Sequence, residues 1–139
     1  MTRFIGISDQ LARTQTQRSD LYEFRTTSGA HVYLHDTDLR RIATDVGSPG
    51  RLHLTFEYDP EWVPPELAST PVIQFDCHEA TMIAWDIDQD SVSDPDAPQG
   101  QVSFFDWDGL DGFSLQTYSR FLTFTTGLVS VSLLPSDRA

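Results

Sequence analysis

The residues most able to do chemistry in this chain belong to a run of aspartates near residue 90. Asp86, Asp88 and Asp90 have the one-residue spacing of ligands 1, 3 and 5 in a helix-loop-helix calcium loop. Ser91 stands where that loop needs Gly, and Ala97 stands where it needs a bidentate Glu. The run is therefore a weak metal candidate, and a solvated or partner-facing loop is the stronger hypothesis.

A second acidic cluster surrounds Trp107. Asp108 precedes a Gly, which is typical of a turn. Trp107 itself could pack in the core, the favoured alternative, or lie exposed among carboxylates as an aromatic anchor for a basic partner. The two clusters together supply the predicted partner-binding residues, which are Asp86, Asp88, Asp90, Asp94, Asp96, Asp106, Trp107, Asp108 and Asp111.

The other potentially reactive residues favour structural roles. Cys77 is the single cysteine and follows an apolar run, which indicates an inert core thiol. It precedes His78, but neighbouring residues of an extended strand point to opposite faces. By the same argument His35 and Asp36 should not pair, and Asp36 is expected to cap a turn.

The overall charge excludes several partners. The chain has 21 acidic residues against nine arginines and no lysine, which gives a formal net charge of -12. This charge repels phosphate backbones, so we expect no binding to nucleic acid or anionic membranes, and we expect a basic protein as the possible partner. No phosphate loop, nucleophile elbow or dinucleotide fingerprint is present, so the sequence predicts a protein that is not an enzyme and uses no cofactor.

Alternating apolar and polar residues predict an all-β fold. In the clearest segment, Leu52 to Tyr58, the even-numbered apolar residues share one face. The pattern predicts a single-domain antiparallel sandwich or barrel of about eight to ten short strands, and the strand count would allow a pair of pseudo-symmetric meanders. Further strands are predicted at Ala30 to Leu34, Leu39 to Val46, Val72 to His78, Thr81 to Asp86, Gln101 to Trp107, Phe113 to Tyr118, Arg120 to Thr125 and Leu128 to Leu134, with a weaker one at Leu21 to Thr27.

The chain divides into an arm and one domain. Residues 1–20 are mostly polar and are predicted to form an N-terminal arm, either flexible or a short helix, followed by a β domain at residues 21–139. No apolar run is long enough for a signal peptide core or a membrane span, which favours the cytoplasm. The segment Asp59 to Thr70 holds three prolines and should leave the sheet as an ordered loop.

The order of these segments resembles that of small bacterial all-β proteins similar to immunity proteins of polymorphic toxin systems. The similarity rests on the turn from Leu34 to Ile42, the strand from Leu52 to Tyr58, and the strands that begin at Val72 and contain Trp85. It implies a small cytosolic protein that occupies and neutralises a toxin without chemistry of its own.

The leading hypothesis is a non-enzymatic, acidic protein-binding domain, for which the resemblance implies immunity-like inhibition of a basic toxin. Its two acidic clusters would form one recognition edge, because negative charge steers a basic partner into contact. The alternatives are a calcium-binding β-module and a cryptic enzyme or small-ligand binder that uses the sandwich interior or barrel mouth. The oligomeric state and the identity of the partner stay open.

Overall fold

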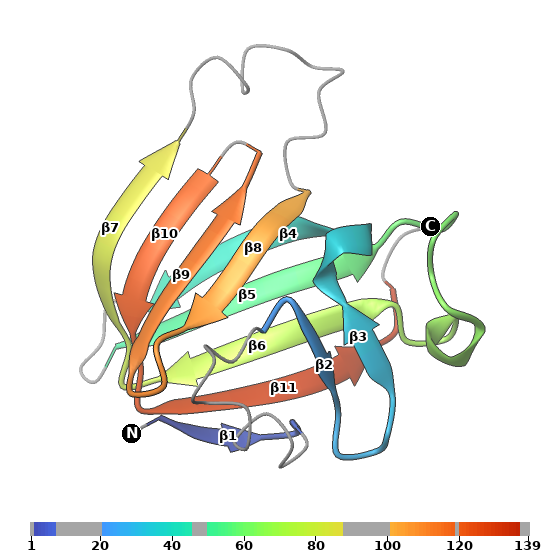
Figure 1. The fold of residues 1–139 in the computed structure, drawn as a ribbon, viewed down its shortest axis with the longest axis horizontal. Coiled ribbons are helices and arrows are strands. Elements are labelled where there is room, and N and C mark those ends of the chain that lie inside the picture. Colours follow the sequence, from blue (N-terminus) through green and yellow to red (C-terminus); the bar gives the residue numbers. More distant parts are fainter. Residues whose placement is uncertain (1, 8–20, 46–49, 88–100, 119, 137–139) are drawn as a thin grey trace.

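Two β-sheets packed face to face form the body of the protein (Figure 1). The computed structural model describes residues 2–7, 21–45, 50–87, 101–118 and 120–136. One sheet has the order β1 (Arg3–Ile5), β11 (Leu128–Leu134), β6 (Val72–His78), β5 (Arg51–Tyr58) and β4 (Thr37–Asp45). The other has the order β7 (Thr81–Ile87), β10 (Arg120–Thr125), β9 (Gly112–Thr117) and β8 (Val102–Trp107). A two-stranded hairpin of β2 (Glu23–Arg25) and β3 (His31–Tyr33) lies beside them.

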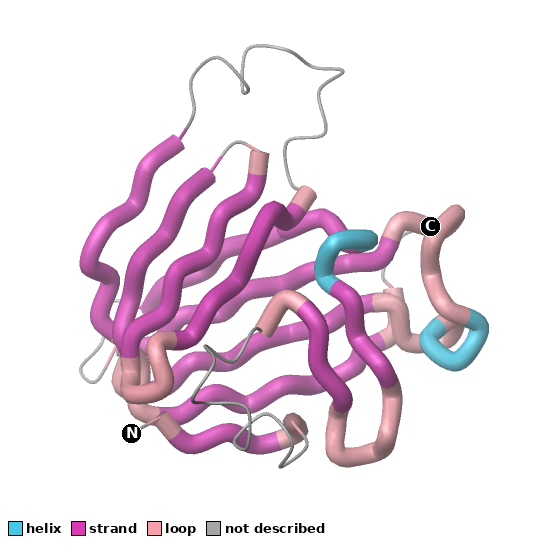
Figure 2. Tube along the Cα trace, viewed as in Figure 1, coloured by secondary structure: helices cyan, strands magenta, loops and turns pink. Residues whose placement is uncertain are grey.

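The all-β prediction is confirmed, and the architecture is a sandwich. An isolated bridge between Asp38 and Gln101 joins the edge of β4 to the start of β8, but no sheet of the described residues closes into a barrel. Short 3-10 turns η2 (Leu34–Asp36) and η3 (Pro65–Leu67) are the helical elements of the described residues (Figure 2). None of them has the length and apolar character needed to cross a bilayer.

The two sheets are built from two similar meanders. β4, β5 and β6 pair consecutively in one sheet, and β7 then crosses to the other. β8, β9 and β10 repeat this arrangement, and β11 crosses back to lie beside β6. Each meander therefore gives its fourth strand to the opposite sheet, so neither sheet is complete without the other half of the chain.

An aromatic core joins the layers. Phe75 of β6 lies 5.3 Å, between ring centroids, from Phe105 of β8 in the opposite sheet. The same ring lies 5.8 Å from Phe24 of the hairpin, and Trp107 meets Phe4 of β1 at 4.8 Å. Aromatic pairs at these separations add attraction to the burial of their apolar area. The core is thus continuous from the N-terminal strand to the hairpin.

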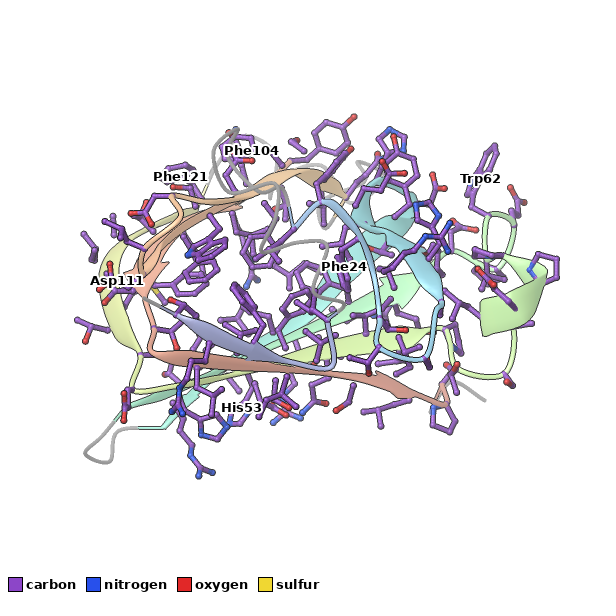
Figure 3. All side chains as sticks on the ribbon, turned by 60° about the horizontal axis from the view of Figure 1, so that its bottom comes forward. Phe24, His53, Trp62, Phe104, Asp111 and Phe121 are labelled. Carbon is purple, nitrogen blue, oxygen red and sulfur yellow. The ribbon has the colours of Figure 1, made fainter. Side chains whose placement is uncertain are left out.

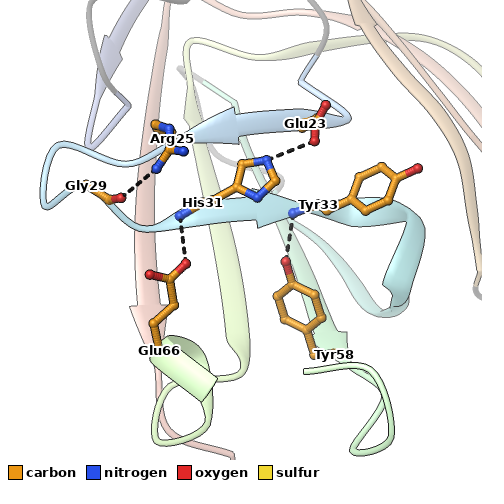
Figure 4. Close-up of polar contacts among 7 residues, drawn as sticks. All are labelled: Glu23, Arg25, Gly29, His31, Tyr33, Tyr58 and Glu66. Atoms are coloured by element: carbon orange, nitrogen blue, oxygen red, sulfur yellow. Dashed lines mark hydrogen bonds and ion pairs between the residues drawn. The ribbon is translucent and has the colours of Figure 1, made fainter. Parts of the chain in front are cut away.

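The β2–β3 hairpin covers the part of the five-stranded sheet that the four-stranded sheet leaves open (Figure 1). It is fastened by the backbone N–H of Tyr33, which donates to the hydroxyl of Tyr58 at 2.7 Å (Figure 4). Burial raises the pKa of Tyr58, and the carboxylates of Asp36, Glu66 and Glu23 raise it further against the opposing hydrogen bond from Tyr33. Tyr58 therefore keeps its proton at neutral pH.

The first residues of the predicted N-terminal arm belong to the sandwich instead. Arg3 to Ile5 pair in parallel with β11, and Ile7 is buried at 5% exposure. Thr2 is also buried, and its N–H donates to the carbonyl of Leu110 at 2.6 Å. A three-residue strand has too little pattern to be found by alternation, because its pairing depends on a strand more than 120 residues away. The rest of the arm, residues 8–20, lies outside the described residues.

Two glycines with similar backbone angles allow a matched stability test. Gly6 has φ +88° and Gly29 has φ +91°, so an added side chain is strained at both. Only at Gly6 would a new Cβ collide with the carbonyl of Val131, since nothing lies within 4 Å at Gly29. We predict that Gly29→Ala lowers the free energy of unfolding by about 1 to 2 kcal/mol, and that Gly6→Ala lowers it by about 2 kcal/mol more. Urea denaturation checks this, and equal losses would contradict the close packing of β1 on β11.

Candidate functional site

The outer face of the four-stranded sheet carries a hollow of about 300 Å³. Its floor is a row of short side chains, because Thr123 of β10 lies opposite Ser114 of β9, which lies opposite Asp106 of β8. In the next row Thr125 lies opposite Gly112, which has no side chain. Short residues on three adjacent strands therefore produce a depression between larger neighbours.

The walls of the hollow and its surroundings combine apolar and acidic groups. Ile83 of β7 lines the hollow and is 61% exposed, and nearby Leu110 is 64% exposed. Beyond the floor, Phe104 and Phe121 lie on either side of Gln116 in the ladder, and Figure 3 shows both rings on the outer side of this sheet. Exposed apolar groups bordered by polar ones are typical of surfaces that contact other proteins.

The second acidic cluster lies at this hollow. Asp106, Asp108 and Asp111 all line it. Asp108 is committed to the turn between β8 and β9, because its Oδ1 accepts the backbone N–H groups of Leu110 at 2.7 Å and Gly112 at 3.1 Å. Asp106 and Asp111 remain as the carboxylates most able to meet a partner.

We expect Asp108→Ala to destabilise the protein because two backbone donors lose their acceptor. The loss in free energy of unfolding should be about 1 to 2 kcal/mol. Asp111→Ala removes the same charge from an exposed position nearby, and it should change stability by less than about 0.5 kcal/mol. Chemical denaturation of both variants measures the difference, and a silent Asp108→Ala would show that the turn does not need its carboxylate.

Trp107 does not serve as an exposed anchor. The side chain is 1% exposed, stacks on Phe113 with centroids 6.3 Å apart, and donates its ring N–H to the carbonyl of Leu110 at 3.1 Å. The structure thus shows the core alternative for Trp107. Leu110 and Ile83 are the exposed apolar side chains that could take the role of anchor at this surface.

The first acidic cluster joins the sheet at the other end. Asp86 pairs through its backbone with Phe121 near the end of β7, whereas Asp108 and Asp111 follow the end of β8. The segment between Ile87 and Gln101 therefore starts and finishes at the strand ends opposite the hollow. Asp88, Asp90, Asp94 and Asp96 lie outside the described residues, so the predicted single acidic edge stays a prediction.

Two predictions about histidine and cysteine are resolved. Cys77 is 1% exposed, and burial raises the pKa of its thiol to about 12, so the inert core thiol is confirmed. The prediction that His35 and Asp36 would not pair is wrong: His35 Nδ1 lies 3.0 Å from Asp36 Oδ1. These residues belong to the 3-10 turn η2, where neighbouring side chains do not alternate as they do on a strand.

A third polar group lies on the outer face of the five-stranded sheet, opposite to the hollow (Figure 3). His53 Nδ1 lies 2.5 Å from Asp76 Oδ1, which also accepts the side-chain N–H of Gln74 at 2.9 Å. Burial raises the pKa of Asp76, but these two hydrogen bonds and the charges of His53 and His78 outweigh it, so the pKa lies below its ordinary value of 3.8. Asp76 is therefore ionised at neutral pH.

The lowered pKa of Asp76 predicts a pH-dependent contribution to stability. A group with a lowered folded-state pKa stabilises the fold fully above its ordinary pKa, and this stabilisation is lost as the pH falls through the lowered value. We expect Asp76→Asn to cost about 1 to 2 kcal/mol at neutral pH, and the difference from wild type should shrink below pH 3.8. Denaturation curves over this pH range, with Asp111→Asn as control, test it; a pH-independent difference would contradict it.

Within the described residues, no group of three or more His, Cys, Asp or Glu side chains is arranged to hold a metal ion. Comparison of the chain with models of protein families, with curated proteins and with solved structures gave no match.

The floor of the hollow was not predicted from the sequence, although the alternation of buried and exposed residues contained a signal for it. The alternation that buries Phe113 and Leu115 turns Ser114 outward, and the same rule turns Thr123 outward on β10. What alternation could not supply is the register that places Ser114 between Thr123 and Asp106.

Proposed function

We propose that this chain is a non-enzymatic domain that binds a basic segment of a partner protein on the outer face of its four-stranded sheet. The observation that carries the proposal is the hollow lined by Asp106 and Asp111 with the exposed Ile83 as a wall. Its volume of about 300 Å³ is at the lower end for small-molecule sites, which suits one large side chain of a partner better than a cofactor.

The two kinds of group in this surface would have different roles. The carboxylates and the net charge of -12 would steer a basic partner and raise its association rate, most strongly at low salt. Burial of Ile83, Leu110 and the row that contains Phe104 would supply affinity, because desolvated apolar contacts dominate most interfaces. Charge alone would give weak, salt-sensitive binding.

The resemblance to immunity proteins suggests a basic toxin as the partner and the cytoplasm as the place where the two proteins bind. The acidic, partly apolar outer face supports this proposal because a nuclease toxin needs a positively charged surface for its own substrate. The interior offers less support for a buried small ligand, since the largest core side chains, Trp107, Tyr58 and Phe56 among them, are less than 2% exposed. The calcium alternative depends on Asp88 and Asp90, outside the described residues.

The test uses an arginine-rich peptide as the probe. We expect the double variant Asp106→Asn/Asp111→Asn to bind a fluorescent nona-arginine peptide roughly tenfold more weakly than wild type, because two carboxylates at the hollow are neutralised. Fluorescence anisotropy at low and physiological salt measures the dissociation constant. Asp108 is left unchanged because it stabilises the turn.

Two controls distinguish binding at the hollow from general electrostatic attraction between the peptide and the acidic protein. Glu61→Gln/Glu66→Gln removes the same charge from the loop and η3 region, outside the four-stranded sheet, and should weaken binding by less than about twofold. Ser114→Phe fills the hollow without changing charge and should weaken binding, whereas Ser132→Phe, on the outer face of the five-stranded sheet, should not. Equal effects of the two carboxylate pairs, or no effect of Ser114→Phe, would refute the proposed site.

A further inference from the structure

The carboxylate of Asp108 contributes to the hollow as well as to its own turn. Its Oδ1 accepts the backbone N–H groups of Leu110 at 2.7 Å and of Gly112 at 3.1 Å. Its Oδ2 lies over Gly112, because a Cβ added to that glycine would be only 2.5 Å from this oxygen. Asp108 and Gly112 both line the hollow. The turn therefore holds one acceptor oxygen at a defined place in the hollow.

The polar side chains around this oxygen are not engaged with one another. Within the described part of the chain, the Oδ2 of Asp108 accepts no hydrogen bond. The other carboxylates and hydroxyls that line the hollow form no side-chain hydrogen bond or ion pair with a described residue; they are Asp106, Asp111, Ser114, Thr123 and Thr125. Polar groups in native structures are paired with protein or with water. These acceptors are therefore open to the donors of a ligand.

The acceptors are spread over three neighbouring strands. Asp106 of β8 lies directly opposite Ser114 of β9, which lies directly opposite Thr123 of β10. Thr125 lies opposite Gly112 in the next row, next to the space over that glycine. Neighbouring strands are about 4.8 Å apart. A ligand group that reaches acceptors on two strands at once must therefore be several ångströms wide and carry donors that point in different directions.

We propose that the hollow selects an arginine side chain of the partner over a lysine, an inference that rests on the proposed binding of a basic segment there. A guanidinium is planar, and its five N–H donors point outward in different directions, so it can bond to Asp106 and to the Oδ2 of Asp108 together. The three donors of a lysine ammonium share one atom and reach a smaller area. Ile83, which forms a wall, can pack against the methylene groups of the arginine.

The experiment compares fluorescent nona-arginine and nona-lysine peptides, which carry the same charge, by anisotropy at physiological salt. We expect the intact chain to bind nona-arginine roughly tenfold more tightly. Asp108→Asn keeps an acceptor oxygen for the turn but places an N–H₂ donor where Oδ2 was, so the preference for arginine should fall to about twofold or less. Asp111→Asn removes the same charge from an exposed position and should weaken both peptides by a similar factor, with the preference retained. Urea denaturation of both variants checks that the fold is kept.

A pair of uncharged variants tests the same inference without altering any carboxylate. Thr125→Val removes a hydroxyl acceptor from the hollow with little change of shape and should weaken nona-arginine binding about threefold. Thr55→Val makes the same change on β5 of the five-stranded sheet and should have no effect.

The outcomes separate this inference from the proposed function. If both peptides bind equally well and Ser114→Phe weakens both, the preference for arginine is overturned while the proposed binding site stands. If neither peptide binds, both proposals fail. The inference is also overturned if Asp108→Asn and Asp111→Asn change the preference by the same factor, or if Thr125→Val and Thr55→Val weaken nona-arginine binding equally.

Discussion

The contact between Phe75 and Phe105 is the constraint on which the other features depend. These two rings, 5.3 Å apart between centroids, join the inner faces of both sheets, and Phe56 and Phe24 extend the cluster toward the hairpin. Because interiors are close-packed, a core filled by such rings leaves little room for a ligand. Polar side chains are consequently placed on the two outer faces, the turns and the loops, and the proposed binding site lies on one of these outer faces.

The exchange of fourth strands between the meanders has a second consequence. The hollow needs β7 for Ile83 but β8 for Asp106, and these strands belong to different meanders. The outer face of the five-stranded sheet likewise combines β5 and β6 of the first meander with β11 of the second and with β1. Each outer surface is thus completed by tertiary pairing of both halves, so neither meander alone would present either surface.

Alternation predicted most of the fold because one face of nearly every strand is buried. The bounds of β6, β10 and β11 agree with the predicted segments, and β1 is the one strand of the described residues that was not predicted. The sites were less predictable. The sequence showed Asp106 and Asp111 as candidates, but the floor that Ser114 provides depends on register, which a single sequence does not encode locally. The rule that neighbouring side chains point to opposite faces also failed at His35, because a 3-10 turn replaces extended backbone there.

The net charge alone describes the molecule poorly, because it sums over the outer faces of both sheets, which carry different side chains. The value of -12 disfavours attraction to phosphate backbones at long range, since distant charges act together. At contact distance, screening limits each interaction to its own neighbours, within about 8 to 10 Å in physiological salt. Asp106 and Asp111 on one outer face and the pair of His53 and Asp76 on the other therefore act mainly on their own neighbours.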